Sequence, residues 1–252
     1  MRVFIIAEII QEYMKTVSIG DTHGKAIADV VLKIINEHDK FIFMGDYVDS
    51  PVIDNLFMKK NLSDIITLKK KYPEKIVLLW GNHDIHYLLG EGHFCTGYRP
   101  GMKQDFYDIF HSNAGLFQLS FQTGDYLWTH AGISRWWYEF RFLPFAEKQK
   151  EGASFSEFLN IAFDKQYKAL FDVGYSRDGH AETGGPLWCD IEELEDDPWA
   201  VLNQIVGHNR VDQFERIKKN NIEIVFIDIL HNADKVNESS FLYKEINNKC
   251  NF

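Results

Sequence analysis

Paired cysteines, long apolar runs and an excess of basic residues are all missing from this sequence of 252 residues. The three cysteines, Cys95, Cys189 and Cys250, are widely spaced and form no CxxC pair. This spacing argues against a disulfide framework and against a thiolate zinc site, so we expect a protein of a reducing compartment, the cytoplasm. The formal net charge of -10 argues against a dedicated nucleic-acid-binding protein, because such surfaces are basic. A local basic groove stays open.

Membrane-spanning and dinucleotide-binding patterns are missing as well. The apolar N-terminal run Met1–Ile10 is too short to cross a bilayer, and Glu8 interrupts it. No small-residue cleavage site follows, so we predict a short strand or helix that packs on the core rather than a signal peptide. No GxGxxG motif follows any predicted strand, which argues against a Rossmann-type binder. We therefore expect no membrane association.

The composition that remains is globular, with 45% hydrophobic and 15% aromatic residues, and the chain is long enough to bury a sizeable core. Strand-like segments alternate with helical patterns in its first part. Strands are predicted at Thr16–Ile19, Lys40–Met44 and Ile76–Trp80, and helices at Lys25–Asn36 and Leu62–Tyr72. This alternation predicts an α/β core in which the loops at one edge of a sheet carry the ligands.

The second part of the chain predicts further strands and an insertion. Leu116–Phe121 and Tyr126–Thr129 have the pattern of a hairpin. The sheet resumes from Gln204, and further strands are predicted at Ile222–Ile227 and Ser240–Ile246. Residues 134–200 differ in composition, with aromatic residues at the start and acidic residues at the end. Their amphipathic stretch Phe155–Phe171 favours a helix. We predict one domain over the whole chain, 1–252, in which residues 134–200 form a mostly helical, cap-like insertion.

Glycine-bearing turns with histidine, aspartate or asparagine follow five strand-like segments. Glycine lets the backbone bend sharply and approach a bound ion or phosphate closely. Ordinary turns use Gly, Asn or Asp but give no reason for histidine to recur at these places. Oxygen and imidazole donors without thiolate suit Mn, Fe, Zn, Co or Mg. The motifs are Gly20-Asp21-Thr22-His23-Gly24, Gly45-Asp46-Tyr47-Val48-Asp49, Gly81-Asn82-His83-Asp84, His130-Ala131-Gly132 and Gly207-His208-Asn209.

These residue types fit a pair of divalent ions. Two ions about 3.5–4 Å apart need one bridging carboxylate, flanking donors, and open positions for water and substrate oxygens. Asp46 is our candidate for the bridging ligand, because an anion shared by two cations relieves their repulsion. Neutral His and Asn ligands add no further charge and leave the ions strongly electrophilic.

In order and in residue type, these motifs resemble the calcineurin-like metallophosphoesterases, and more narrowly the bacterial type of the phosphoprotein phosphatase (PPP) branch. The resemblance implies an α/β fold, a β-sandwich of mixed sheets flanked by helices. It also implies two divalent metal ions, with manganese favoured and iron, zinc, cobalt, nickel or magnesium as alternatives. Arg210 stands where many wider superfamily members have a further metal-binding histidine, which favours the PPP-like branch. The implied ligands are Asp21, His23 and Asp46 for one ion, and Asp46, Asn82, His130 and His208 for the other.

The activity that the resemblance implies is hydrolysis of a phosphoester by direct attack of a metal-bound hydroxide, without a covalent enzyme intermediate. His83 would protonate the leaving oxygen, and Asp49 would orient His83 and stabilise its charged form. Asp84 and Asp228 are expected to contact the metal ligands and hold them in place without binding the metal ions themselves.

One departure from the family concerns the phosphate. PPP enzymes usually have an arginine after the second motif, where its planar fork grips the phosphate, and this chain has Ser50 there. We predict that Arg210 does this work, because it lies close to a proposed ligand, and Arg135 is the next substrate-binding candidate. For Arg99 and Arg177 a solvated surface position is the favoured interpretation.

The favoured substrates are phosphomonoesters, either small phosphoesters or phosphoserine and phosphothreonine in a partner protein, as in the serine/threonine phosphatases. Gly81–His86 and His130–Ile133 also resemble the symmetrical dinucleoside tetraphosphatases, and the aromatic run Trp136–Phe142 could stack on a nucleobase. A third hypothesis, from another class, is a metal-binding scaffold that has lost catalysis.

Overall fold

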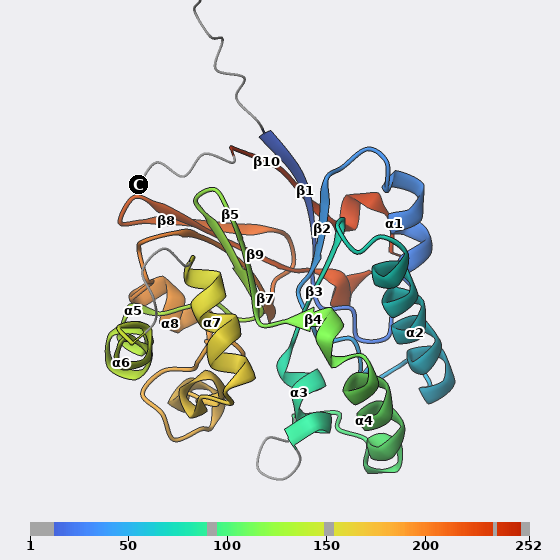
Figure 1. Cartoon of the computed structure of the whole chain (residues 1–252), viewed down its shortest axis with the longest axis horizontal. Coiled ribbons are helices and arrows are strands. Elements are labelled where there is room, and N and C mark those ends of the chain that lie inside the picture. The colour runs from blue at the N-terminus through green and yellow to red at the C-terminus, as the bar shows by residue number, and fades with distance from the viewer. Residues whose placement is uncertain (1–12, 90–94, 149–153, 234–235, 248–252) are drawn as a thin grey trace, which may run out of the picture.

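The structure is a computed structural model that describes residues 13–89, 95–148, 154–233 and 236–247 (Figure 1). The N-terminal run Met1–Ile10, for which we predict a packed strand or helix, lies outside these residues. Within the described ranges, no helix is both long and apolar enough to cross a lipid bilayer.

Two five-stranded sheets form the centre of the molecule, and both are mixed. In the first sheet β1 to β4 run parallel and β10 pairs with β1 in the antiparallel direction. In the second, β6, β7 and β9 run parallel, flanked by the antiparallel β5 and β8. The predicted α/β sandwich of mixed sheets is confirmed. In spatial order, the first sheet contains β10 (Leu242–Asn247), β1 (Tyr13–Ile19), β2 (Lys40–Phe43), β3 (Ile76–Leu79) and β4 (Phe117–Gln118), and the second β5 (Ser120–Thr123), β6 (Tyr126–Thr129), β7 (Asn203–Arg210), β9 (Ile222–Asp228) and β8 (Glu215–Lys219).

Alternate residues of the strands face two different cores. In β2, Ile42 points into the space between the sheets, whereas Phe41 and Phe43 point to the helices on the outer face. This alternation follows from the two-residue period of a strand. Because both faces of the central strands are buried, their sequences read as continuous apolar runs. The layer between the sheets is built from Ile42, Met44, Val77, Leu79, Trp128, Ile205, Val225 and Ile227.

Helices α1 (Ala28–Ile34), α2 (Asn55–Lys71) and α4 (Lys103–Ser112) cover the outer face of the first sheet, and α3 (Asn82–Leu89) begins directly after the third motif (Figure 1). Helix α2 begins earlier than its apolar periodicity predicts. Asp54 caps it by accepting hydrogen bonds from two backbone N–H groups, and its first turn carries exposed apolar residues that break the pattern. Short 3-10 helices connect these elements at Pro100–Met102, Ala114–Leu116, Leu230–Asn232 and Glu238–Ser240.

One strand prediction is wrong, and one strand was not predicted. Leu116–Phe121 is not one strand, because the chain passes from β4 in the first sheet to β5 in the second within it, and only β5 forms the predicted hairpin with β6. Strand β8 has no counterpart among the predicted strands. Its sequence, Glu-Arg-Ile-Lys-Lys, is charged and partly exposed because it lies at the edge of its sheet.

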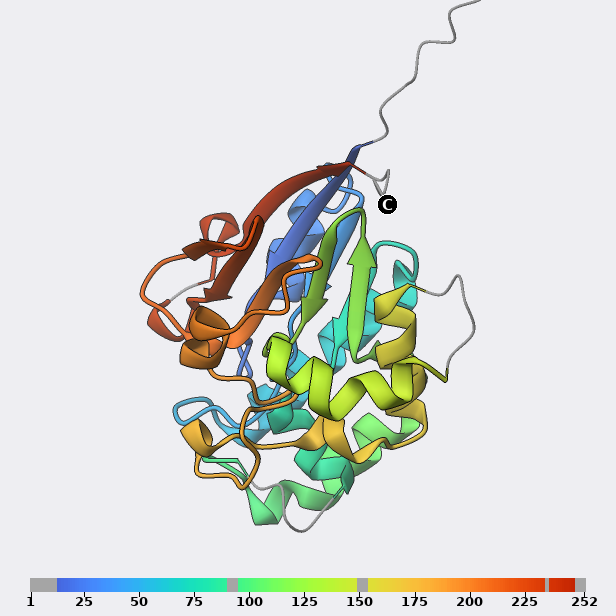
Figure 2. The same ribbon diagram turned by 90° about the vertical axis from the view of Figure 1, so that its left-hand side faces the viewer.

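The segment 134–200 is mostly helical in its described part, but its helices are short. The helix predicted over Phe155–Phe171 ends at Asp164, and a 3-10 turn follows. Figure 2 shows the segment gathered at one end of the second sheet. Its separation as a cap stays a prediction. Its helical elements are α5 (Arg135–Trp137), the π-helical turn Tyr138–Phe142, α6 (Leu143–Ala146), α7 (Phe155–Asp164), the 3-10 turns Lys168–Phe171 and Tyr175–Arg177, and α8 (Ile191–Asp196).

Candidate active site

The motif turns meet at one edge of the sandwich. Three of them follow β1, β2 and β3 of the first sheet, and two belong to β6 and β7 of the second. Parallel strands end at the same edge, so polar turns that are distant in sequence become neighbours. A cavity of about 1410 Å³ opens there. Its walls include Asp21, His23, Asp46, Asn82 and His208, and His130 is fully buried.

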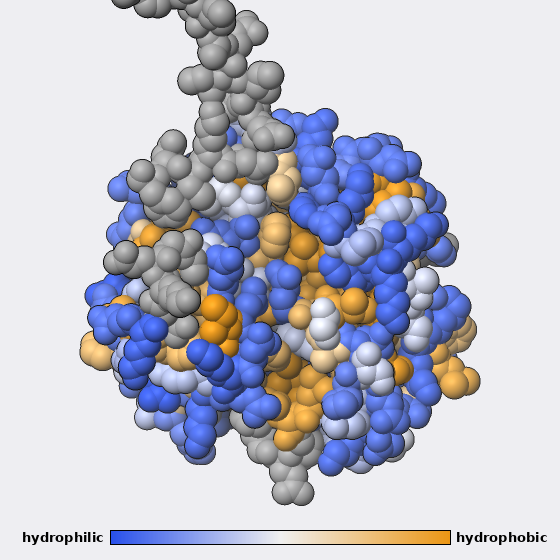
Figure 3. Space-filling view, in the orientation of Figure 1, coloured by the Kyte–Doolittle hydropathy of each residue, from blue (hydrophilic) through white to orange (hydrophobic). Residues whose placement is uncertain are grey.

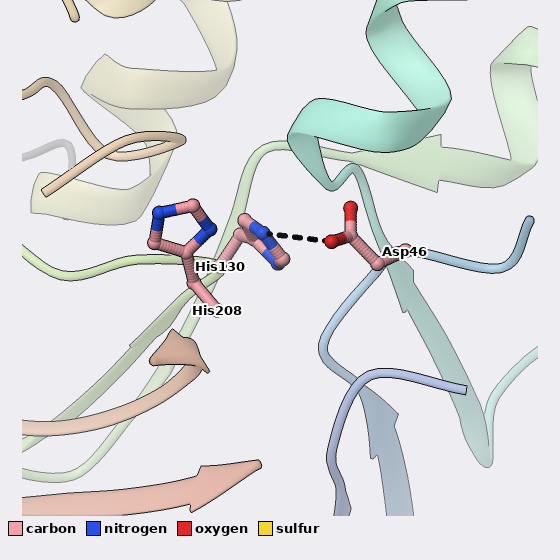
Figure 4. A group of neighbouring side chains, drawn as sticks. All are labelled: Asp46, His130 and His208. Atoms are coloured by element: carbon pink, nitrogen blue, oxygen red, sulfur yellow. Dashed lines mark ion pairs between the residues drawn. The ribbon is translucent and has the colours of Figure 1, made fainter. Parts of the chain in front are cut away.

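Asp46 lies at the centre of the predicted ligands. Its Oδ2 is 3.6 Å from His130 Nε2 and 3.9 Å from His23 Nε2. Figure 4 shows His130 and Asp46 pointing toward each other from the two sheets, with His208 beside them. Donor atoms of Asp21, His23 and Asp46 lie within 4.8 Å of one another, and so do those of Asp46, His130 and His208. Asp46 is common to both groups, as a bridging ligand must be.

Two of the imidazoles are held in the tautomer that a metal requires. His23 Nδ1 is 2.8 Å from the carbonyl oxygen of Val48, and His130 Nδ1 is 2.7 Å from that of Met44. A carbonyl only accepts, so each Nδ1 carries the proton and each Nε2 presents a lone pair to Asp46. Burial lowers the pKa of His130 to about 3. Burial is also the main reason that the pKa of His23 falls to about 4, and the nearby His83 contributes to this decrease. Both rings are therefore neutral at physiological pH.

The side-chain amide of Asn82 completes the second group. Its Oδ1 lies 2.8 Å from His130 Nε2 and 3.2 Å from His208 Nδ1, and its Nδ2 donates to Cys95 Sγ. An amide oxygen and the lone pair of His130 thus face each other. A cation between them is the partner that satisfies both.

Buried carboxylates give a second test of whether metal ions fit. Burial, reinforced by neighbouring carboxylates, raises the pKa of Asp21 and of Asp46 well above the usual value. Burial also raises the pKa of Asp228 to about 7, and neither of its oxygens has a hydrogen-bond partner among the described residues. Such a group of buried anions is costly without positive charge. Two divalent ions would supply it, so the residues fit the metal pair that the sequence predicts.

The ligands depend on an unusual backbone. Four of the site residues have positive φ: 40° at His23, 52° at Asp46, 62° at Asp49 and 59° at His208. Non-glycine residues seldom adopt this left-handed conformation, and it concentrates at functional sites. Each turn thereby directs a polar side chain away from its strand and into the cavity.

Asp84 holds two of the turns together. Its Oδ2 accepts hydrogen bonds from the backbone N–H of Asp46 at 2.8 Å and of Gly81 at 3.0 Å, and its Oδ1 from that of Tyr47 at 2.9 Å. Gly81 itself must lack a side chain, because a Cβ there would lie 2.1 Å from Asp46 Oδ1. The predicted support of the ligands by Asp84 thus has a definite geometry.

His83 and Asp49 form a pair at the cavity wall. His83 Nδ1 is 3.1 Å from Asp49 Oδ2, which leaves Nε2 facing the cavity, 4.0 Å from Asp46 Oδ2. Asp49 also accepts a hydrogen bond from the Tyr87 hydroxyl at 2.5 Å, and its Oδ2 lies 2.8 Å from His86 Nε2. Burial alone would raise the pKa of Asp49, but the interactions with His83, His86 and Tyr87 outweigh it and lower the pKa. Asp49 is therefore held ionised beside His83.

The sequence reasoning missed His86 and Tyr87. Both lie on α3 with His83, at the third and fourth residue after it, a spacing that places side chains on one face of a helix. That spacing is the signal that could have found them. Cys95 N–H donates to His86 Nδ1, which puts the ring proton on Nε2, where it reaches Asp49.

The arginines divide differently from the prediction. Arg210 is exposed and lines the cavity, but Arg135 is not part of its lining and pairs with Asp197 and Glu139 instead. The interpretation of the other two as solvated surface arginines is wrong. Arg99 is partly buried and binds the loop after Asp49, and Arg177 lines the cavity, held by Asp190 and Asn209.

Comparison with known proteins decides the family. A model of the calcineurin-like phosphoesterases matches residues 14–226, which include all five motifs. The chain belongs to this family. This calcineurin-like phosphoesterase is 40% identical over 47 residues to the serine/threonine-protein phosphatase 6 catalytic subunit of Drosophila melanogaster. The matched stretch is 19% of this chain and 14% of that protein.

A solved structure shares the fold of this calcineurin-like phosphoesterase. It is a cold-active protein-tyrosine phosphatase of a psychrophilic Shewanella species, with a TM-score of 0.58 and 14% sequence identity. The match covers 93% of this chain and 81% of the Shewanella chain. The likeness therefore extends through both sheets and the segment 134–200.

Proposed function

We propose that this calcineurin-like phosphoesterase is a dinuclear metal-dependent phosphatase that hydrolyses phosphomonoesters. The observation that carries the proposal is the convergence of two ligand groups on Asp46, with the His83–Asp49 pair facing the same cavity. A scaffold without catalysis would need the metal ligands but not a histidine held by a buried, ionised aspartate.

The proposed ligands are those that the structure brings together, Asp21, His23 and Asp46 on one side and Asp46, Asn82, His130 and His208 on the other. Manganese is our first choice among the metals. When bound, two divalent ions would neutralise the phosphoryl oxygens and lower the pKa of water, making it a better nucleophile. The protein keeps the histidine donors neutral and all the donors fixed, so little rearrangement accompanies binding.

His83 is the proposed proton donor to the leaving oxygen. Its Nε2 faces the cavity, while Nδ1 donates to Asp49. Burial lowers the pKa of His83, and the hydrogen bond to Asp49 opposes this effect by favouring the imidazolium. Asp49 thus fixes the tautomer and the ring orientation, and it stabilises the charge that His83 carries before it gives up its proton.

Arg210 is the proposed phosphate-binding arginine. It lines the cavity together with His23 and His83, and in β7 it lies opposite Asp228 of β9, which also lines the cavity. Ser50, which replaces the usual family arginine, is buried, and its Oγ accepts from the N–H groups of Val52 and Ile53. Ser50 therefore stabilises the loop that follows it, and an arginine from another part of the chain must bind the phosphate.

Phosphorylated protein is the proposed substrate class. The Drosophila relative is named as a serine/threonine-protein phosphatase, and the Shewanella protein of similar fold as a protein-tyrosine phosphatase. The cavity, of about 1410 Å³, offers the volume that a phosphorylated side chain needs. Dinucleoside tetraphosphate is the second candidate, because Trp136 lines the cavity and offers a stacking surface for a base. Its companions Trp137 and Phe142 are fully buried in the core and offer none.

The test is hydrolysis of p-nitrophenyl phosphate and of its bis-ester by metal-stripped protein to which Mn has been returned. We expect monoester turnover in the wild type and a loss of about 100-fold or more in Asp46→Asn and His83→Asn. Asp29→Asn and His111→Asn, both at exposed positions, are the matched controls and should keep the wild-type rate. Protein that binds Mn but turns over neither ester nor a dinucleoside polyphosphate would contradict the proposal.

A further inference from the structure

An exposed apolar surface adjoins the cavity beside the His83–Asp49 pair. Val52, Leu56 and Phe57 are 85%, 79% and 60% exposed, and we call these three residues the rim patch. Pro51, next to Val52 in the chain, lines the cavity. Figure 3 shows hydrophobic atoms at the right-hand margin, where the first turn of α2 lies in Figure 1. The rim patch therefore begins where the cavity ends.

The loop that carries the rim patch is held in place from behind. The Arg99 guanidinium donates to the carbonyl oxygens of Ser50 and Ile53 and to the side chain of Asn55. Asp54 Oδ1 accepts from the N–H groups of Leu56 at 2.9 Å and Phe57 at 3.1 Å. A surface fixed in this way loses little conformational entropy when a partner covers it.

Charged pairs border the rim patch on α2. Lys59 pairs with Asp105 at 2.9 Å and Lys60 with Asp64 at 2.6 Å. An exposed apolar surface with a polar border is typical of an interaction site, because water contact with large apolar side chains is unfavourable.

We propose that the rim patch binds apolar residues of a phosphorylated polypeptide that flank the residue whose phosphate enters the cavity. This inference rests on the proposed function and narrows its substrate class. A small phosphoester bound at the metal ligands ends inside the cavity, whereas an extended chain advances about 3.3 Å per residue and continues across the rim. Continuity of the patch with the cavity through Pro51 favours that occupant.

Two phosphopeptides of equal length test the proposal, one with Leu and Phe beside the phosphorylated residue and one with Ser at those positions. We expect wild type to favour the apolar peptide by about tenfold in kcat/KM. The combined variant Val52→Ser, Leu56→Gln and Phe57→Gln should lose this preference mainly through KM, with p-nitrophenyl phosphate turnover unchanged. Val201→Ser is the control and should keep the preference, because Val201 is 59% exposed and lies two residues before β7, at the end of that strand opposite His208.

Equal rates for the two peptides in wild type, or a preference that survives in the combined variant, would overturn the proposal. Sedimentation of wild type and of the combined variant tests the other possible occupant of the rim patch, a second copy of this chain. If the substitutions convert a dimer into a monomer and leave the peptide preference intact, the rim patch is a contact between copies of this chain.

Fluorescence anisotropy with dye-labelled peptides measures binding without hydrolysis, so it separates this inference from the proposed function. Patch-dependent binding without hydrolysis of any ester would support the docking surface and reject the phosphatase.

Discussion

Asp46 is the side chain that joins the two groups of predicted metal ligands, and its backbone conformation and its neighbours make this possible. It reaches both ligand groups because a left-handed backbone turns it away from β2, and Asp84 holds the N–H groups of the same turn. The neighbouring histidines are neutral because burial lowers their pKa and because carbonyl oxygens hold the Nδ1 protons of His23 and His130. Neutral histidine and asparagine donors add no negative charge to that of Asp21 and Asp46, so bound ions would keep positive charge for the substrate phosphate.

Arg210→Ala tests the proposed phosphate contact. We expect KM for p-nitrophenyl phosphate to rise about tenfold, because the variant loses a charged hydrogen-bonding partner of the phosphate. Arg135→Ala is the matched control, since Arg135 pairs with Asp197 outside the cavity lining, and its kinetics should stay at the wild-type value. Initial rates over a range of substrate concentrations measure both. An effect of Arg135→Ala as large as that of Arg210→Ala would reject the assignment.

Asp228 should make the metal-stripped protein less stable as the pH rises. Burial raises its pKa from 3.8 to about 7 in the folded state, so the stabilisation from its bound proton is complete below pH 3.8 and is lost as the pH rises through about 7. The loss amounts to about 4 kcal/mol in the free energy of unfolding. Asp228→Asn should remove this part of the pH dependence in urea unfolding between pH 4 and pH 8. If the free energy of unfolding of Asp228→Asn changes with pH as it does in wild type and in the exposed control Asp29→Asn, this prediction is wrong.

The residues that the sequence predicts are those whose chemistry recurs in a motif. His23, His83, His130 and His208 stand out because glycine turns do not need histidine. His86 carries only the weaker signal of its helical spacing from His83, and Arg177 carries none, because its position depends on a contact with Asp190 that no local pattern displays. Arg135 is the second substrate-binding candidate from the sequence, and its ion pairs with Asp197 and Glu139 direct it elsewhere.

The motif turns depend on one another, because the backbone of one turn packs closely against a ligand of another. Gly207 lies against Asp21, and a Cβ at this position would be 2.3 Å from Asp21 Oδ1. The N–H of His208 donates to the same carboxylate at 3.0 Å. The glycine of the fifth motif therefore sets the position of a ligand from the first.

Gly207→Ala should displace the Asp21 carboxylate. We expect the free energy of unfolding to fall by about 1–3 kcal/mol and the affinity for Mn to fall with it, because the neighbouring atoms must move. Gly115→Ala is the control, since nothing lies within 4 Å of a Cβ there. Urea unfolding and equilibrium dialysis against Mn measure the two effects. Wild-type Mn affinity in Gly207→Ala would show that the site tolerates the side chain.

Among the elements, those with two buried faces or a clear helical period are predicted well. The strands at Lys40 and Ile76 and the helix ending at Lys71 are recognised from their apolar runs and helical period. The first seven residues of α2, Asn55–Asn61, are missed because Leu56 and Phe57 face solvent, and β8 is missed because its residues are those of an edge. The change of sheet at Leu119 depends on the tertiary fold, so no local signal marks it.

Across the whole molecule, the site exists only because the two sheets present the same edge. Asp21 meets His208 and Asn82 meets His130, contacts that join the first sheet to the second. The sequence predicts the motifs, and the family resemblance implies their grouping, but their distances depend on the packing of Trp128, Ile205 and their neighbours between the sheets. Folding and assembly of the site are therefore one event.

The rate of p-nitrophenyl phosphate hydrolysis, followed while Mn is added stepwise to metal-stripped protein, tests the account most directly. If Asp46 joins two ligand groups, the rate should rise from near zero and saturate at about two Mn per chain, and Asp46→Asn should show no such rise. A full rate without added metal, or saturation at one Mn per chain, would contradict the two-metal phosphatase.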